Sequence, residues 1–251
     1  MTSDDGRLAR DLAEQAGHLL LELRSGGGDP VSLRKAGDRQ SHEFLAAELA
    51  RLRPGDAVLS EEGLDDAARL SASRVWIVDP LDGTREFGEP GRTDWAVHVA
   101  LWELGELTAG AVALPAQGKV LSTVDPLPAR PAPPPGTLRF VASRTRPPAF
   151  VEQMARDMGA VLLPMGSAGA KAAAVITGDA EAYIHSGGQY EWDSAAPVAV
   201  AVAAGLHASR IDGSKLAYNQ AHPSLPDILI CEASLAGPLL EAISSAGAAA
   251  G

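Results

Sequence analysis

The chain has 251 residues, of which 46% are hydrophobic and 21% are charged. This composition is typical of a globular protein with a sizeable core, built as one elaborate domain or two ordinary ones, and it excludes a disordered chain. The 32 acidic residues outnumber the 21 basic residues, so the formal charge is −11 at pH 7 and a nucleic acid is not expected as a partner.

The N-terminal segment is acidic and then amphipathic, and it lacks both a basic start and a continuous apolar stretch. Neither a secretion signal nor a membrane span is therefore predicted, and the cytoplasm is the expected location. The single cysteine, Cys231, lies in an apolar run and has no second cysteine for a disulfide. We expect it to be a buried structural thiol.

Two helices are predicted at the start of the chain. Apolar residues at three- and four-residue steps indicate a helix from Asp4 to Arg24, and a second helical pattern runs from Ser41 to Leu52. The glycine-rich segment between them, residues 24–38, is interpreted as a linker or as a mobile lid.

Five short apolar runs follow the two helices, and the close spacing of the last three predicts an antiparallel meander. The runs are AVLS (57–60), RVWIV (74–78), WAVHVALW (95–102), LTAGAVAL (107–114) and KVLSTV (119–124). The first half of the chain is therefore predicted as two helices on an antiparallel sheet.

A proline-rich segment, Asp125 to Gly136, cannot continue a helix or an inner strand, because prolines lack the backbone donor. We predict it as the boundary between an N-terminal domain, residues 1–130, and a C-terminal domain, residues 137–251. In the second domain, strand patterns alternate with helical patterns, which predicts an α/β layer. The strands are expected at 138–143, 160–164, 181–185 and 227–231, and the helices at 148–158, 167–177, 193–204 and the C-terminal end.

Two aspartates, Asp79 and Asp82, follow the run RVWIV and are separated by Pro80 and Leu81. Carboxylates held this close repel each other unless a cation lies between them or one is protonated. Magnesium suits such a site, because it prefers hard oxygen ligands and keeps positions open for water and phosphate. The alternative for this pattern alone is an Asx-type turn with Gly83.

Further acidic groups also border apolar elements. Glu61 and Glu62 follow the run AVLS, and Asp193 opens an alanine-rich helix. Taken singly, the two glutamates are interpreted as a solvated turn and Asp193 as a helix N-cap. Taken together with Asp79 and Asp82, they fit the way in which a scaffold presents metal ligands at one rim. This favours a magnesium-dependent enzyme that cleaves a phosphate ester.

The motifs SEEG, WIVDPLDGT and WDSAAP, in this order and at these distances, resemble those of the inositol monophosphatase superfamily of lithium-sensitive, magnesium-dependent phosphatases. The continuation DPLDGTREF is similar to the branch of CysQ-type 3'(2'),5'-bisphosphate nucleotidases, and the whole chain is most similar to actinobacterial members of that branch. The resemblance implies a layered α-β-α-β-α sandwich of the inositol monophosphatase and sugar phosphatase type, with mixed α+β and α/β character. It also suggests a homodimer.

The resemblance assigns roles residue by residue, with most metal ligands in the first domain and the substrate-binding residues and Asp193 mainly in the second. The implied metal ligands are Glu61, Asp79, the carbonyl of Leu81, Asp82 and Asp193. The implied catalytic residues are Glu61, Thr84, whose hydroxyl orients the attacking water, and Asp38, its acidic partner. The implied substrate-binding residues are Gly83, Thr84, Ser143, Arg144, Ser167, Lys171 and Asp193.

Two magnesium ions are implied, and calcium or lithium is expected to inhibit. A third ion stays open, because the family pattern D-x-V-T-x-x-D is reduced here to SLRKAGD. The implied mechanism is direct displacement by a metal-activated water, without a covalent enzyme intermediate.

The implied substrate is 3'-phosphoadenosine 5'-phosphate, together with 3'-phosphoadenylyl sulfate, with a role in sulfate assimilation. A bisphosphate nucleotide needs cations for its second phosphate, and Arg144 and Lys171 are the candidates. Ser186 favours the nucleotide, because inositol-preferring relatives have a glutamate at that position. A broader phosphatase acting on inositol phosphate or fructose 1,6-bisphosphate is the alternative.

Two other classes of function compete with this interpretation. A haloacid-dehalogenase-like phosphatase also uses strand-end aspartates, but its second aspartate would stand at the position of Leu81. A non-catalytic module, in which the same carboxylates bind a structural cation, stays open. His98 and His185 are predicted to be structural residues rather than ligands.

Overall fold

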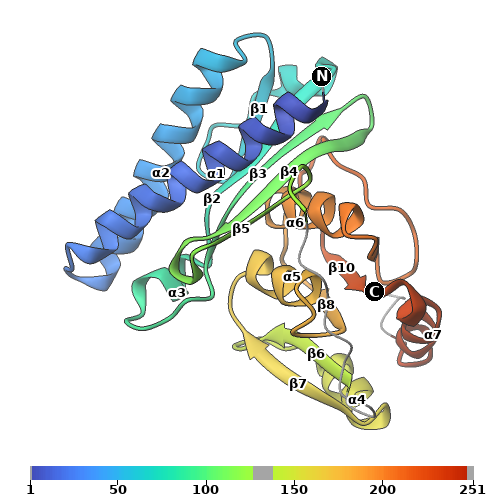
Figure 1. The fold of residues 1–251 in the computed structure, drawn as a ribbon. Coiled ribbons are helices and arrows are strands. Elements are labelled where there is room, and N and C mark those ends of the chain that lie inside the picture. The colour runs from blue at the N-terminus through green and yellow to red at the C-terminus, as the bar shows by residue number, and fades with distance from the viewer. Residues whose placement is uncertain (1, 127–137, 248–251) are drawn as a thin grey trace.

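The computed structural model describes residues 2–126 and 138–247, which form alternating layers of helices and sheets (Figure 1). Helices α1 and α2 cover one face of a first five-stranded sheet, and α5 and α6 pack between this sheet and a second five-stranded sheet. Helices α4 and α7 cover the outer face of the second sheet. The predicted α-β-α-β-α sandwich is confirmed.

The first layer consists of α1 (Thr2–Ser25) and α2 (Pro30–Leu52). Helix α1 matches its prediction, but α2 begins far earlier than expected, so the interpretation of residues 24–38 as a linker or lid was wrong for most of that segment. The Asp29 side chain accepts a hydrogen bond from the Ser32 backbone N–H at 2.8 Å, and Pro30 occupies the first helical position. This start signal places Asp38 on a helix rather than on a loop.

The first sheet has the strand order β1-β2-β3-β4-β5. Its strands are β1 (Ala57–Ser60), β2 (Arg74–Asp82), β3 (Ala96–Glu103), β4 (Glu106–Leu114) and β5 (Lys119–Ser122). Strands β3, β4 and β5 form the predicted meander, but β1 pairs with β2 in parallel, so the sheet is mixed rather than antiparallel throughout. Parallel pairing brings the carboxyl ends of β1 and β2 to the same edge.

The second sheet has the strand order β7-β6-β8-β10-β9. Its strands are β6 (Leu138–Ser143), β7 (Ala160–Met165), β8 (Ala182–Ser186), β9 (His207–Ser209) and β10 (Asp227–Cys231). The helices of this half are α4 (Ala149–Asp157), α5 (Ala168–Ile176), α6 (Glu191–Ala203) and α7 (Ala236–Ser245). Each predicted element is present, whereas β9, the short helix α3 (Thr84–Gly88) and the 3-10 turns at 67–71, 115–117 and 233–235 were not predicted.

The middle layer has a core that both sheets share. Apolar side chains of the first sheet, of α5 and α6, and of the second sheet form one buried cluster, which includes Ile77, Val175 and Ile230. Cys231 is buried as predicted, in the cluster beneath α4 and α7. Most of the predicted boundary segment lies outside the described residues, and the division into two domains stays a prediction.

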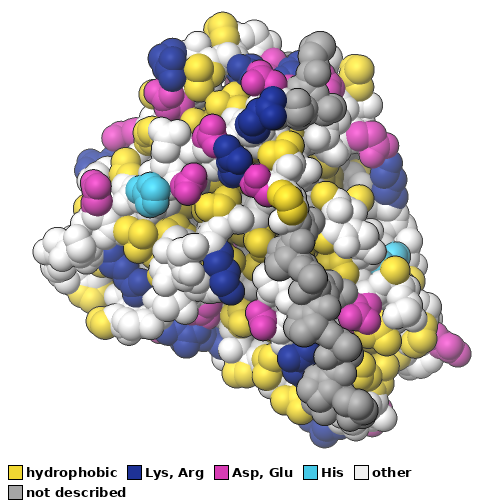
Figure 2. Space-filling model, in the orientation of Figure 1, with side chains coloured by type: hydrophobic (Ala, Val, Ile, Leu, Met, Phe, Trp, Pro, Cys, Tyr) yellow, Lys and Arg dark blue, Asp and Glu magenta, His cyan; other side chains and the backbone are white. Residues whose placement is uncertain are grey.

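Charged side chains of both signs are interspersed on the face of the molecule over α1 and α2, as Figure 2 shows. This face therefore offers no basic patch that would offset the acidic net charge. Within the described residues, no helix combines the length and the apolar character needed to cross a bilayer.

Gly110 on β4 sets how closely α6 approaches the first sheet. A Cβ atom at this position would lie 2.7 Å from the Ala199 Cβ and 3.3 Å from the Ala196 carbonyl oxygen. We expect Gly110→Ala to lower the free energy of unfolding by about 1–3 kcal/mol through overpacking. Thermal unfolding of the wild type and of Gly110→Ala measures this loss of stability. Gly55→Ala is the control, because Gly55 has open space around it, and equal stability of the two variants would contradict the predicted close packing.

Candidate active site

The acidic residues of the site lie at the ends of neighbouring strands. Ser60 on β1 pairs with Val78 on β2, so Glu61 and Asp79 follow at the same edge of the sheet. The pairing of β2 with β3 becomes irregular between Asp79 and Asp82. Such an irregularity changes the direction in which side chains point, and here it lets both aspartates serve one site.

Three carboxyl groups converge at this edge. One oxygen from each of Asp79, Asp82 and Asp193 lies within 4.8 Å of the other two. Asp79 and Asp82 are 1% and 7% exposed, and Asp193 comes from the first turn of α6. Its side chain accepts a hydrogen bond from the Tyr190 N–H at 2.7 Å, so Asp193 closes a capping box from inside the helix rather than acting as the predicted N-cap.

The cluster is electrostatically strained without a cation. Burial, followed by repulsion from Glu61 and Asp82, raises the pKa of Asp79 well above its usual value. Burial and the charge of Asp82 raise the pKa of Asp193 to about 7. The Oδ2 atom of Asp79 is buried and has no hydrogen-bond partner among the described residues. A divalent cation with a preference for oxygen would relieve both problems, so the residues present fit magnesium.

Glu61 borders this cluster without joining its compact core. The side chain is exposed to solvent, although its carboxyl group lies close enough to Asp193 and Asp82 to feel their charges. Partial desolvation of the carboxyl group and the repulsion from Asp193 raise the pKa of Glu61 to about 7. Glu61 therefore shares the electrostatic environment of the three aspartates, as a fourth ligand would.

Asp82 is held differently from the other members of the cluster. Its carboxylate accepts hydrogen bonds from the backbone N–H groups of Ala168 at 3.1 Å and Gly169 at 2.7 Å, and from the Ser167 hydroxyl. Although burial alone would raise it, the positive charges of His98 and Lys171 and the hydrogen bond from Ser167 lower the pKa of Asp82 to about 2. The N-terminus of α5 thus keeps Asp82 ionised.

Gly83 allows α5 to come this close. It has a φ of 84°, and a Cβ atom there would lie 3.1 Å from the Ser167 Cβ and 3.2 Å from the Asp94 carbonyl oxygen. Both the left-handed backbone and the crowding favour glycine. Gly83 therefore acts on the site through its backbone, between the metal cluster and the first turn of α5.

Thr84 and Asp38, which the resemblance paired, are in contact. The Thr84 hydroxyl lies 3.0 Å from Asp38 Oδ1 and 3.0 Å from the Leu81 carbonyl oxygen, so its one hydrogen has two acceptors. Burial, opposed in part by this hydrogen bond, raises the pKa of Asp38 to about 6. The early start of α2 is what brings Asp38 here, and the buried Ser41 one turn later donates to the Pro80 carbonyl oxygen at 2.6 Å.

Two neighbouring cavities adjoin the cluster, with volumes of about 400 and 430 Å³. The first is lined by Asp82 and Asp193, and both are lined by the same four residues: Ser143, Arg146, Ser167 and Lys171. The volumes are typical of small-molecule sites. Acidic side chains of the cluster and basic side chains therefore line the same cavity.

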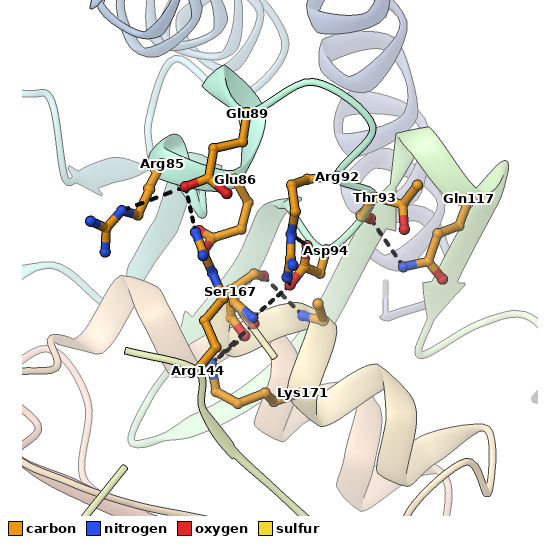
Figure 3. A network of polar contacts seen from close by, with 12 residues as sticks. Arg85, Glu86, Glu89, Arg92, Thr93, Asp94, Gln117, Arg144, Ser167 and Lys171 are labelled. Atoms are coloured by element: carbon orange, nitrogen blue, oxygen red, sulfur yellow. Dashed lines mark hydrogen bonds and ion pairs between the residues drawn. The ribbon is translucent and has the colours of Figure 1, made fainter. Parts of the chain in front are cut away.

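Arg144 lies at the second cavity, but its guanidinium group is already occupied. Figure 3 shows it extending from the end of β6 toward α3, where it donates to Glu86 at 2.6 Å and to Glu89 at 2.7 Å. Arg85 approaches Glu89 at 3.7 Å. Glu86 is thus paired with Arg144 rather than with its neighbour in the chain, Arg85.

Lys171 is buried and bonds within its own helix. Its ammonium group donates to the Ser167 carbonyl at 2.5 Å and to the Gly166 carbonyl at 3.1 Å, and burial lowers its pKa. Ser143 accepts a hydrogen bond from the Arg146 N–H at 3.2 Å. The structure thus places all five of the predicted second-half substrate residues around the cavities, but it leaves Arg144 and Lys171 with few free donors.

Sequence reasoning missed two residues at this site. Arg146 lines both cavities, and its guanidinium group makes no ion pair with residues 2–126 or 138–247. His98, predicted to be structural, lies beside Asp79 and Asp82. A signal existed for each: Arg146 is the second arginine of SRTR, and His98 is the one polar residue of AVHVALW.

A profile described as the inositol monophosphatase family matches residues 8–245. The chain belongs to the inositol monophosphatase family. Enzymes of this family are generally magnesium-dependent. The family is distinct from the haloacid dehalogenases, which removes the support for that alternative.

Curated members of the family match over nearly their whole length. The protein called 3'-phosphoadenosine 5'-phosphate phosphatase in Mycobacterium tuberculosis is 55% identical over 240 residues, covering 92% of this chain and 90% of that protein. The protein of the same name in Mycobacterium leprae is 51% identical, covering 95% and 93%. The crystal structure of CysQ from Bacteroides thetaiotaomicron superposes with a TM-score of 0.78 at 26% identity, covering 92% of this chain and 97% of that chain.

The raised pKa values predict how pH acts on the metal-free protein. A carboxyl group with a higher pKa in the folded than in the unfolded chain stabilises the fold below its unfolded pKa, and this contribution is lost as the pH rises through the folded pKa. The folded values are about 6 for Asp38 and about 7 for Glu61 and Asp193, against unfolded values of about 4. In EDTA, thermal stability should therefore fall from about pH 4 to pH 7.

Magnesium should oppose this fall of thermal stability with rising pH, because the carboxylates that bind it must be deprotonated. Thermal unfolding between pH 5 and pH 8 should show a gain in Tm with magnesium that grows with pH. Asp79→Asn removes one buried charge, so it should raise the Tm in EDTA at pH 8 and abolish the gain with magnesium. A gain that is absent, or independent of pH, would contradict the assignment of these carboxylates as metal ligands.

Proposed function

We propose that this chain is a magnesium-dependent phosphatase that removes the 3'-phosphate from 3'-phosphoadenosine 5'-phosphate, and from 3'-phosphoadenylyl sulfate. The observation that carries this proposal is one cavity that is lined both by the acidic residues Asp82 and Asp193 and by the basic residues Arg146 and Lys171. Such a cavity suits a substrate with one phosphate at a metal centre and a second anionic group some distance away. The names of the mycobacterial relatives support the same substrate.

The residues that would hold magnesium are Glu61, Asp79, Asp82, Asp193 and the carbonyl of Leu81. Bound there, magnesium would lower the pKa of a water molecule and neutralise phosphoryl oxygens. We propose two ions and leave a third open, and we propose that calcium and lithium inhibit by competing for the same oxygens. The homodimer and the cytoplasmic location stay predictions.

Thr84 and Asp38 would orient the attacking water and manage its proton. When the Thr84 hydroxyl donates to Asp38 Oδ1, the lone pairs of Thr84 Oγ1 are free to accept a hydrogen from that water. A pKa of about 6 lets Asp38 take up a proton near neutral pH. The pair thus provides a path for a proton from the water to a carboxylate on α2.

Arg146 is our candidate for the second phosphate, in place of Arg144. Both arginines lie at the end of β6 or just after it. The guanidinium group of Arg144 is held by Glu86 and Glu89, whereas that of Arg146 has no ion-pair partner in the part of the chain that the structure describes. Its position on the wall that the two cavities share gives it access from either side. A guanidinium group forms paired hydrogen bonds with phosphate, which suits this role.

The alternative substrates are inositol phosphate and fructose 1,6-bisphosphate. Ser186 lines the cavity at the position where inositol-preferring relatives have a glutamate. A serine at this position removes a carboxylate acceptor for sugar hydroxyls and leaves room for a larger nucleoside. This observation favours the nucleotide.

Phosphate release from 3'-phosphoadenosine 5'-phosphate, measured with magnesium and with EDTA, tests the proposed function. We expect hydrolysis only with magnesium, inhibition by lithium or calcium, and a lower kcat/KM for inositol 1-phosphate and fructose 1,6-bisphosphate. Higher kcat/KM for either of those two would favour the broader phosphatase. No activity on any of the three, with magnesium bound, would favour a non-catalytic module.

Thr84→Val should lower kcat by roughly 10²–10⁴-fold, because the hydroxyl that orients the water is lost. Thr84→Ser keeps the hydroxyl and should retain most of the activity. Circular dichroism and the Tm would show that both variants fold. Equal activity of the two variants would remove Thr84 from the mechanism.

Arg146→Ala should lower kcat/KM for 3'-phosphoadenosine 5'-phosphate by about ten- to hundredfold, the range expected for a charge-assisted hydrogen bond. It should leave kcat/KM for adenosine 3'-monophosphate unchanged, because this substrate has no second phosphate. Arg156→Ala, on the exposed face of α4, is the control for loss of one positive charge. An equal loss on both substrates would show that Arg146 does not bind the second phosphate.

A further inference from the structure

His98 occupies an unusual place for a histidine. It lies on β3 with 0% of its surface exposed, directly across from Asp79 in the pairing of β2 with β3. Its neighbours on the same face of the strand, Ala96 and Ala100, belong to the apolar core of the middle layer. A polar ring in such a position needs partners for its nitrogens.

The partners of the His98 ring belong to the metal centre. Its Nε2 atom lies 3.2 Å from Asp82 Oδ2, and its Nδ1 atom lies 3.9 Å from Asp79 Oδ2. The Nδ1 atom also lies 3.1 Å from the carbonyl oxygen of Trp192, the residue before Asp193. One imidazole ring therefore contacts two carboxylates of the cluster and the backbone that carries the third.

Both ring nitrogens face acceptors, a carboxylate on one side and a carbonyl on the other. The Nδ1 atom donates to the Trp192 carbonyl, because a carbonyl oxygen can only accept. The Nε2 atom lies within ion-pair distance of Asp82 Oδ2 but makes no hydrogen bond with the described residues. These two contacts hold the ring in one orientation between β2 and α6. An apolar side chain of similar volume would fill the same space. The Trp192 carbonyl would then lose the hydrogen bond from the ring, and Asp82 would lose the nearby Nε2 atom.

The first turn of α5 is shaped to fit around the ring. A Cβ atom at Gly169 would lie only 2.1 Å from His98 Nε2 and 3.1 Å from the Ala96 Cβ. The Gly169 N–H is also one of the donors that hold Asp82. Glycine at this position thus lets α5 reach Asp82 and His98 at the same time.

We infer that His98 is a positioning residue for the metal centre: its ring fixes the Asp82 carboxylate and the first turn of α6, so that the ligands are arranged before the cation binds. It is not itself a ligand. This inference rests on the proposed function in so far as the cluster binds magnesium. Neighbours that orient metal ligands commonly affect metal affinity by ten- to hundredfold.

Binding of Mn²⁺ as a probe, followed by electron paramagnetic resonance on the full chain without substrate, tests the inference. We expect His98→Leu to weaken Mn²⁺ binding by roughly tenfold or more and His98→Gln, whose amide can donate to Asp82, to recover most of the affinity. With saturating magnesium, KM for the substrate should stay close to that of the wild type. A purely structural role would lower the Tm of both variants without separating their metal affinities.

The outcomes distinguish a failure of the inference about His98 from a failure of the proposed function. A folded His98→Leu protein that binds Mn²⁺ as tightly as the wild type would overturn the inference and leave the proposed function intact. A wild-type protein that binds Mn²⁺ but releases no phosphate would overturn the proposed function, while the comparison of variants would still measure the role of His98. If the leucine variant does not fold, His98→Met, which also lacks a side-chain nitrogen, replaces it, and Mn²⁺ binding as tight as in the wild type would then overturn the inference.

Discussion

The mutual repulsion of buried carboxylates is the constraint on which this structure depends. Asp79, Asp82 and Asp193 belong to two layers, and their oxygens lie within 4.8 Å of one another although each gains by moving away. The layers prevent this movement. Asp79 is fixed in a central strand, and α6, which carries Asp193, packs against β2, β3 and β4 on one side and β9 on the other. The fold thus holds these groups where ionising all three is unfavourable, and a divalent cation would offset that cost.

The four acidic side chains of the site respond differently to this repulsion. Asp82 accepts three hydrogen bonds from the start of α5 and stays ionised, whereas the pKa values of Asp79, Asp193 and Glu61 are raised. One carboxylate is thus permanently charged, and the others are set to lose their protons when a cation arrives. Both helices of the middle layer begin at this edge, so the positive ends of their dipoles face the region that holds anions.

The sequence predicted the parts of the fold that depend on local pattern and missed those that depend on pairing. Alternation identified the meander, but nothing in AVLS or RVWIV shows that these strands pair in parallel. The second helix was predicted too short because apolar periodicity outweighed the Asp29–Pro30 start signal.

At the site, the proposed metal ligands could be predicted from three ordered sequence motifs. Arg144 was favoured over Arg146 because the competition from Glu89, which follows a helix that was not predicted, exists only in the folded chain. Alternation along β3 puts His98 with Ala96 and Ala100, so its burial was readable, but its contact with Asp82 was not.

Arg144, whose guanidinium group is paired with Glu86 and Glu89, has a structural role at the cavity. Arg144 joins the end of β6 to Glu86 and Glu89 around α3, the helix that begins with Thr84, and Asp94 accepts from both Arg92 and the Gly166 N–H. These contacts tie α3 and the segment after it, which follow the proposed metal ligands at the end of β2, to the rim of the cavity (Figure 3). In a chain with a net charge of −11, an anionic substrate meets an unfavourable overall field. Local positive charge must then come from groups that the protein's own carboxylates do not neutralise. Within the described residues at this rim, Arg146 meets that requirement, and Arg144 holds in place the surface from which Arg146 can act.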